Sequence, residues 1–230
     1  MIALRTLSVG VCTLLWLMPY ACGETGDEAA DQLACSIPRQ YWRNFDSLSK
    51  SMRRSYAGSR QFSSSENGRL RARLVYRWIT GHMRYGDLNP DNFPLRPSYR
   101  SFHGSYFNDG YSPQSSLTRG YTNCGGFSLL FEALASQMDL KVEYFKGYAR
   151  GFENVPRYHA WNAVKIGDEW KMIDATWGAV PQERENWFLV PSREFLKSHV
   201  PDSAYLDSSC YKETKLTQTM LGKLRKNLLR

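Results

Sequence analysis

The sequence has few cysteines, no metal-ligand spacing and a single long apolar run. Five cysteines stand among 230 residues, and none is arranged with a second cysteine or a histidine at the spacing of a zinc site. No calcium-ligand run and no RNA-binding motif is present. We therefore expect no metal, no organic cofactor and no nucleic-acid partner. At this length we expect one domain with a full-sized core.

The apolar run, residues 7–18, is too short to span a membrane comfortably. It follows a short basic start and precedes Ala21-Cys-Gly23, a small-residue exit of the kind that signal peptidase cleaves. We predict a signal peptide at residues 1–23 and a secreted or periplasmic protein. The minor alternative is lipoprotein anchoring through Cys22, although Pro19 stands where a lipobox usually has Leu.

Export decides how the cysteines are used. Cleavage leaves Cys35, Cys124 and Cys210, and three thiols in an oxidising compartment suggest one bridge and one free thiol. A bridge between Cys35 and Cys210 would leave Cys124 free. The alternative is that all three are reduced, because a sequence does not fix the distances between Cα atoms.

The net charge of +8 and the pI near 9.3 favour loose contact with anionic surfaces such as cell wall or phospholipid. Residues 211–230 form a predicted basic helix with leucines and a methionine at helical spacing. Such a helix either packs one face on its own domain, which we favour, or makes weak contact with a membrane surface through residues 212–230.

Helices precede strands along the chain, which predicts an α+β fold. Residues 24–38 are acidic and small and predict a flexible leader. Residues 84–120 combine prolines and aromatics without a clear period, and we interpret them as the rim of a cleft. The predicted domain covers 39–210, with helices at 41–56 and 70–79, strands at 142–148, 158–166, 169–176 and 187–190, and a short helix at 192–198 capped by Ser192.

Cys124 stands where a loop turns into an apolar helix, with Thr122 or Asn123 as the N-cap. A helix N-terminus and a nearby imidazole both favour the thiolate, which is the form that attacks carbonyl groups. Gly125 and Gly126 are poor helix formers, and they make sense where backbone approaches a substrate closely. Alone, Cys124 would more simply be a buried structural cysteine.

A hairpin register links His159 to Asp174. A two-residue turn with glycine first pairs Ile166 with Glu169, which makes His159 and Asp174 diagonal neighbours on one face. A slip of one residue would separate them. A carboxylate within reach fixes the tautomer of an imidazole, so the two residues and Cys124 predict a Cys-His-Asp nucleophilic site. We assign structural or rim roles to the remaining histidines, His82, His103 and His199.

Three motifs, Cys124-Gly-Gly-Phe-Ser-Leu-Leu, His159-Ala-Trp-Asn-Ala-Val and Met172-Ile-Asp-Ala-Thr-Trp177, resemble those of the transglutaminase-like superfamily, with the kyphoscoliosis-peptidase type as the nearest branch. The likeness covers residues 70–208. It implies a papain-like core in which N-terminal helices pack on an antiparallel β-sheet. It also implies Cys124 as nucleophile, His159 as base and then acid, and Asp174 as the group that orients the imidazole.

We therefore predict an exported cysteine enzyme that acts on amide bonds through a thioester on Cys124. Water as acceptor makes it a peptidase or amidase, and an amine makes it a transglutaminase-type acyltransferase. The substrate is a protein or peptide, including cell-wall peptide, in a cleft that we assign to Asn123, Gly125, Trp161 and Trp177. The alternative is a non-enzymatic peptide- or wall-binding module, against which the intact Cys, His and Asp argue.

Overall fold

The protein was studied as a computed structural model that describes residues 26–57, 64–86, 99–100, 106–107, 112–151 and 155–229. The predicted signal peptide lies outside the described residues, as does most of the predicted cleft rim. Among the described helices, none is both long and apolar enough to cross a bilayer.

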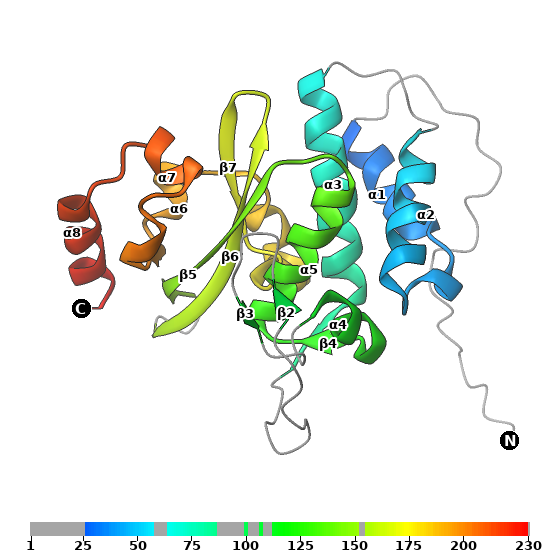
Figure 1. Ribbon diagram of the computed structural model, residues 1–230, viewed down its shortest axis with the longest axis horizontal. Coiled ribbons are helices and arrows are strands. Elements are labelled where there is room, and N and C mark those ends of the chain that lie inside the picture. Colours follow the sequence, from blue (N-terminus) through cyan, green and yellow to red (C-terminus); the bar gives the residue numbers. More distant parts are fainter. Residues whose placement is uncertain are drawn as a thin grey trace, which may run out of the picture.

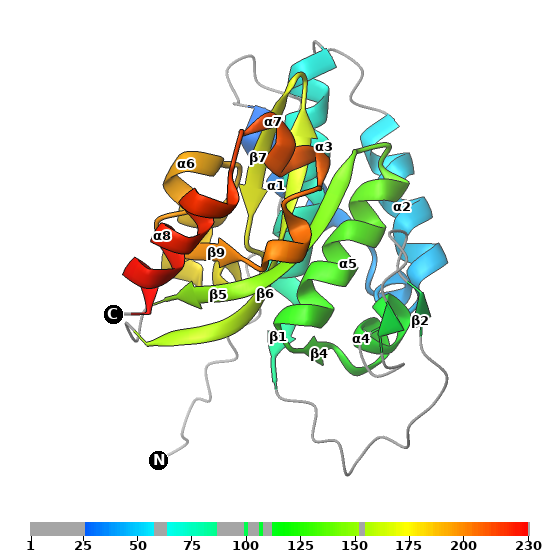
Figure 2. The ribbon, with the colours of Figure 1, turned by 60° about the vertical axis from the view of Figure 1, so that its left-hand side comes forward.

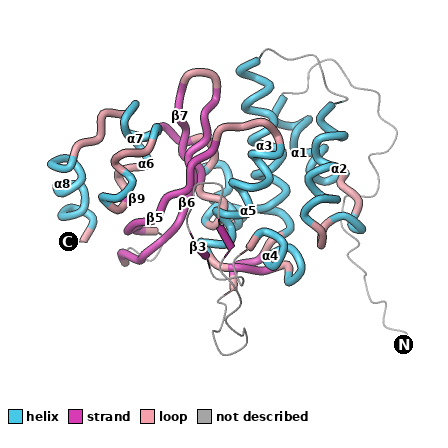
Figure 3. The backbone as a smooth tube through the Cα atoms, viewed as in Figure 1, coloured by secondary structure: helices cyan, strands magenta, loops and turns pink. Residues whose placement is uncertain are grey.

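A central antiparallel sheet lies between two groups of helices, which confirms the predicted α+β class (Figures 1 and 3). The strand order is β8-β7-β6-β5-β9. The strands are β5 Val142–Arg150, β6 Pro156–Ile166, β7 Glu169–Ile173, β8 Val190–Pro191 and β9 His199–Pro201.

The N-terminal helices cover one face of this sheet (Figure 2). They are α1 Gly26–Ser36, α2 Phe45–Ala57, α3 Ser64–His82, α4 Pro113–Arg119 and α5 Cys124–Gln137. Helix α5 contacts both α3 and β6, and every residue from Gly126 to Ala135 is buried. A helix that is apolar on all sides belongs inside a domain, so α5 holds its first residue at a fixed place against the sheet.

Helix α1 corrects the prediction of a flexible leader. Residues 26–36 are helical and pack on α3. The apolar surface comes from three buried alanines, whose small size gave no hydrophobic signal in the sequence. Ion pairs add to the contact: the carboxylate of Asp31 accepts a 2.7 Å hydrogen bond from Arg73, a buried side chain of α3, and Asp27 pairs with Arg69.

The other face of the sheet is covered by α6 Ser192–Phe195, α7 Ser209–Glu213 and α8 Gln218–Leu228. The predicted helix at 211–230 is divided between α7 and α8, because Lys215 has a φ of 56° at which a helix cannot continue. The larger hydrophobic core lies between the N-terminal helices and the sheet, and a second core lies between the sheet and α6, α7 and α8. This second core contains Phe145, Trp161, Ala163, Trp170, Met172, Phe195, Val200, Cys210, Tyr211, Leu216 and, from α8, Leu221 and Leu228. Packing of this helix on its own domain is therefore confirmed.

The hairpin between β6 and β7 has the predicted register. Ile166 pairs with Glu169 and Asn162 pairs with Ile173, around a turn in which Gly167 has a φ of 58°. Strand β7 is shorter than predicted and ends at Ile173. The chain then forms two 3₁₀ helices, η5 Trp177–Ala179 and η6 Pro181–Trp187.

Two further sequence predictions are wrong beyond this hairpin. The strand expected at 187–190 is reduced to Val190–Pro191, because η6 extends to Trp187. The short helix begins at Ser192 itself and ends at Phe195, with Pro191 at the N-cap position and no side-chain cap.

Two small sheets lie beside the N-terminal helices. Strand β1, Arg84–Tyr85, pairs in parallel with β4, Tyr121–Thr122, while β2, Tyr99–Arg100, pairs with β3, Tyr106–Phe107. The first of these pairs brings Tyr85 next to the segment that leads into α5.

The predicted bridge between Cys35 and Cys210 is not formed. The physical reason is the layering of the fold. Cys35 is exposed on α1 and Cys210 is buried on α7, and these helices lie on opposite sides of the sheet (Figure 1). A disulfide requires Cα atoms within about 7 Å of each other, which this arrangement excludes.

Candidate active site

Cys124 is the first residue of α5, as the sequence predicted. Asn123 is the N-cap, and its Oδ1 accepts a 3.2 Å hydrogen bond from the backbone N–H of Gly126. The sulfur thus stands at the positive end of the helix dipole and is partly exposed. The glycine at 126 has a packing reason instead of the predicted substrate reason, because a Cβ there would lie 1.8 Å from Thr122 Oγ1.

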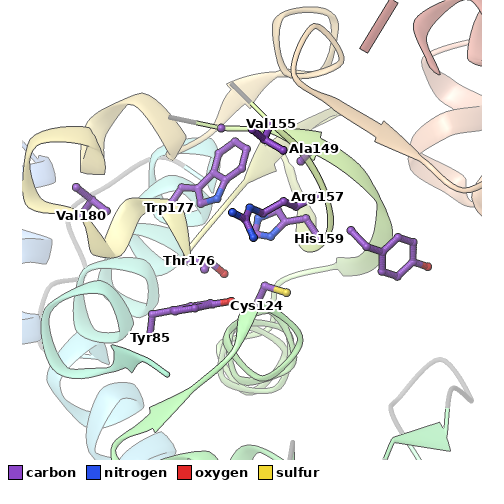
Figure 4. A pocket seen from close by; sticks show the side chains of 11 residues that line it. Tyr85, Cys124, Ala149, Val155, Arg157, His159, Thr176, Trp177 and Val180 are labelled. Atoms are coloured by element: carbon purple, nitrogen blue, oxygen red, sulfur yellow. The ribbon is translucent and has the colours of Figure 1, made fainter. Parts of the chain in front are cut away.

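His159 lies on β6 and is 7% exposed. Its Nε2 lies 2.7 Å from Oδ2 of Asp174, which leaves Nδ1 as the ring nitrogen available to Cys124, and both residues line the same pocket. The ring of Trp177 stacks on the imidazole with centroids 4.8 Å apart and planes 17° apart. Figure 4 shows Cys124, His159 and Trp177 around one pocket. The predicted contact between His159 and Asp174 is therefore confirmed.

Asp174 is fully buried and is held at both carboxylate oxygens. Its Oδ1 accepts hydrogen bonds from the backbone N–H groups of Thr176 at 2.9 Å and Trp177 at 3.0 Å. Its own backbone N–H donates to the carbonyl oxygen of Trp187. The prediction placed Asp174 within the strand, but it is the residue at which the chain leaves β7. The turn that follows is what directs Oδ2 at the imidazole.

The charges of the site stabilise one another. Burial disfavours the imidazolium of His159, but the charge and hydrogen bond of Asp174, together with Cys124, raise the pKa of His159 to about 10. Burial likewise disfavours the Asp174 carboxylate, yet His159 and His199 hold its pKa well below the usual range. At neutral pH the pair is an imidazolium and a carboxylate. The positive ring next to Cys124 stabilises negative charge on the sulfur.

A fourth side chain, His199, joins the site, which the sequence reasoning did not anticipate. It lies on β9, which pairs with the other edge of β5, and its Nε2 is 3.3 Å from Oδ2 of Asp174. The side chain is fully buried, so a rim role is wrong. No spacing in the sequence relates His199 to Asp174. The one available signal was its place inside the segment that resembles the superfamily.

Among the described residues, His159, Asp174 and His199 form the group whose spacing could hold a metal ion. Their ligand atoms all lie within 4.8 Å of one another. Both imidazoles are, however, hydrogen-bonded to the same carboxylate oxygen, so a cation would have to replace these bonds. The arrangement is that of a hydrogen-bonded relay.

A pocket of about 490 Å³ opens above Cys124 and His159 (Figure 4). Trp177 lines it, as predicted for the cleft. Trp161 does not, because it is fully buried in the second core. Asn123 serves as the helix cap, and Gly125 follows the cysteine without lining the pocket. Tyr85 also lines it and falls within residues 84–120, which the sequence analysis interpreted as the cleft rim. Lining residues that the sequence did not reveal are Ala149, Gly151, Val155, Arg157, Tyr158, Thr176 and Val180.

Comparison with known proteins agrees with this geometry. The family model described as the transglutaminase-like superfamily matches residues 57–175, more than half of the chain. Kyphoscoliosis peptidase of Mus musculus and that of Homo sapiens are each 26% identical to the chain over 150 residues. The match covers 58% of this chain and 21% of each relative, so the chain spans about a fifth of their length.

Two solved structures are also similar. One is a candidate cysteine protease from Cytophaga hutchinsonii, with 22% identity and a TM-score of 0.39 over 59% of this chain and 39% of that one. The other is a TGase with 20% identity and a TM-score of 0.36 over 61% of this chain and 34% of that one. On the extent of the family match, this chain belongs to the transglutaminase-like superfamily.

Proposed function

We propose that this protein is a cysteine enzyme that acts on amide bonds through a thioester on Cys124. The observation that carries the proposal is the position of His159, whose ring is hydrogen-bonded to Asp174 and lines the same pocket as Cys124. A nucleophile, a proton carrier and an orienting carboxylate within one hydrogen-bonded chain are the groups that acyl transfer requires.

The proposed reaction has two halves. The Cys124 thiolate attacks the carbonyl carbon of an amide, and the C–N bond breaks as His159 gives its proton to the leaving amine. The acyl group remains on sulfur as a thioester. An acceptor then attacks the thioester carbon, gives its proton to His159 and releases the acyl product, which restores the thiolate. The backbone N–H of Cys124 is the natural donor to the developing oxyanion.

Water is the acceptor that the pocket favours. Four lining side chains, Tyr85, Val155, Tyr158 and Val180, are between 41% and 57% exposed. Because these described pocket walls are accessible to solvent, water can reach the thioester. Transfer to an amine would require that water be excluded from the pocket. We therefore propose a peptidase or amidase, with transglutaminase-type transfer to an amine as the second outcome. Its substrate is a protein or peptide, cell-wall peptide included.

The test is intact-mass trapping of the acyl-enzyme with a library of peptide and glutamine donors. Wild type is expected to gain the mass of the acyl part of one donor, and Cys124→Ala is expected to gain none. Adding a primary amine then separates the two outcomes, since a transferase forms the amide and a hydrolase releases the acid. Equal labelling of both proteins would remove Cys124 from the mechanism.

A peptide-binding module that does not turn over substrate is the rival. Iodoacetamide discriminates between the two, because an activated thiolate is alkylated near neutral pH and an ordinary thiol reacts mainly at alkaline pH. A Cys124 that stays inert until alkaline pH would favour the binder.

We further propose export through residues 1–23 and weak contact of α8 with anionic membranes. On α8 the side chains of Lys223, Arg225 and Lys226 are exposed, and Met220 beside them is 48% exposed. Because Leu221 belongs to the core, reversing the charges of Lys223 and Lys226 is a cleaner test than deleting the helix. Unchanged binding to anionic liposomes would remove the membrane proposal, and secretion of a fusion to residues 1–23 tests export.

A further inference from the structure

One carboxylate oxygen serves two imidazoles in this fold. Oδ2 of Asp174 lies 2.7 Å from Nε2 of His159 and 3.3 Å from Nε2 of His199. The two histidines come from different strands, β6 and β9, which pair with opposite edges of β5. Oδ1 is occupied by two backbone N–H groups, so His199 is the second side chain on this carboxylate, beside His159.

The protonation of His199 follows from its neighbours. Burial lowers the pKa of His199 to about 4, so the ring is neutral near pH 7 and carries one N–H. An ionised carboxylate only accepts hydrogen bonds, so that proton is on Nε2. Nδ1 is then an acceptor, 2.8 Å from the hydroxyl of Ser198, whose single proton also has the carbonyl oxygen of Phe195 within reach at 3.3 Å. The carboxylate of Asp174 therefore selects the tautomer, and the hydroxyl of Ser198 is compatible with it.

Packing alone does not account for a histidine at this place. Its ring stacks on Phe195 at 3.8 Å and meets Trp161, Trp177 and Trp187 at centroid distances between 4.5 and 5.4 Å. A phenylalanine side chain would pack among these aromatic rings without the free-energy cost of burying two ring nitrogens. What histidine adds is an N–H directed at the carboxylate.

We propose that His199 is a positioning residue, whose N–H fixes Oδ2 of Asp174 so that the carboxylate orients His159 toward Cys124. The inference rests on the proposed function, because it assigns His199 a part in the same relay. His199 does not line the pocket and reaches His159 through two neighbours, the carboxylate of Asp174 by a hydrogen bond and the ring of Trp177 by packing. The other titratable groups that face Asp174 are His159 and Tyr76 of α3.

Two substitutions separate the hydrogen bond from the packing. His199→Phe keeps the stacking and removes the donor, while His199→Gln keeps an N–H at similar reach and removes the aromatic ring. A hydrogen bond to a charged group predicts a fall of about ten- to a hundred-fold in kcat for His199→Phe, with KM unchanged. His199→Gln is expected to keep most of the wild-type kcat. A role in packing alone predicts the reverse order.

The pH profile supplies a readout that a packing role would not move. Without the donor the Asp174 carboxylate is less stabilised, so it protonates at higher pH. The acid limb of kcat, and that of Cys124 alkylation by iodoacetamide, is therefore expected to shift upward in His199→Phe and to stay in place in His199→Gln. If the His199→Phe variant had the same kcat as wild type, and the acid limbs of both pH profiles were unchanged, the proposal would be overturned.

Alkylation also keeps this inference separate from the proposed function, because it needs no substrate. If wild type forms no acyl-enzyme, the proposed function fails, yet the comparison of the two variants still tests His199. Should circular dichroism show that His199→Phe is unfolded, Ser198→Ala takes its place. It removes the hydroxyl 2.8 Å from Nδ1 and is expected to shift the acid limb in the same direction by less, and an unshifted limb would again overturn the proposal.

Discussion

Replacing Asp174 with Asn tests the electrostatic core of the site. Asn keeps an oxygen that can accept from the N–H groups of Thr176 and Trp177, so the turn after β7 is preserved. At the position of Oδ2 it places an NH₂ group, which donates where the carboxylate accepts. Nε2 of His159 must then be the acceptor, and the ring proton moves to Nδ1, facing Cys124. In that tautomer the imidazole cannot take a proton from the sulfur.

The size of the expected fall in kcat follows from the carboxylate charge that the substitution removes. The pKa of His159 is raised from 6.5 to about 10, which corresponds to roughly 5 kcal/mol of preference for the imidazolium. Most of this preference comes from Asp174, and burial acts against it. Without the carboxylate, burial makes the ring neutral at neutral pH. A wrong tautomer in a comparable triad costs about 10⁴-fold in kcat, so we expect a fall of roughly 10³- to 10⁴-fold here.

The assay is kcat on a peptide that labels the wild type, together with the rate of Cys124 alkylation at about pH 6 and pH 9. The Asp174→Asn variant should lose the reaction near pH 6, because no imidazolium stabilises the thiolate there. Asp168→Asn is the matched control, since it makes the same change at an exposed position in the turn of the same hairpin. A kcat for Asp174→Asn within ten-fold of wild type would refute the reasoning.

Three further predictions follow from the same geometry. Replacing Trp177 with Leu removes the ring stacked on His159 and should lower kcat/KM by about three- to thirty-fold, whereas Phe should largely retain it; equal losses would remove stacking as the cause. The pKa of His159 is higher in the folded than in the unfolded protein, so its contribution to the free energy of unfolding is complete below about pH 6.5 and is lost as the pH rises through about 10. Urea titrations should therefore show that wild type loses stability over this pH range and that Asp174→Asn loses much less. Native-state alkylation with peptide mapping should modify the exposed Cys35 and spare the buried Cys210. A peptide bridged between Cys35 and Cys210 would contradict their separation by the sheet.

Local signals in the sequence determined much of the candidate site. The cap and apolar run placed Cys124 at the start of a helix, and one glycine in a two-residue turn set the register that brings His159 and Asp174 together. Such signals succeed because caps, turns and adjacent strand pairs involve residues that are close along the chain.

Contacts between distant segments were decided only by the tertiary structure. His199 reaches Asp174 because β9 pairs with the free edge of β5, and no local pattern states which strand will do so. Helix α1 is held on α3 by buried alanines and by ion pairs to residues far along the chain, such as that of Asp31 with Arg73. The layering of helices on both faces of the sheet likewise separates Cys35 from Cys210. Each depends on the free energy of the whole packed chain, which no single segment carries in its own sequence.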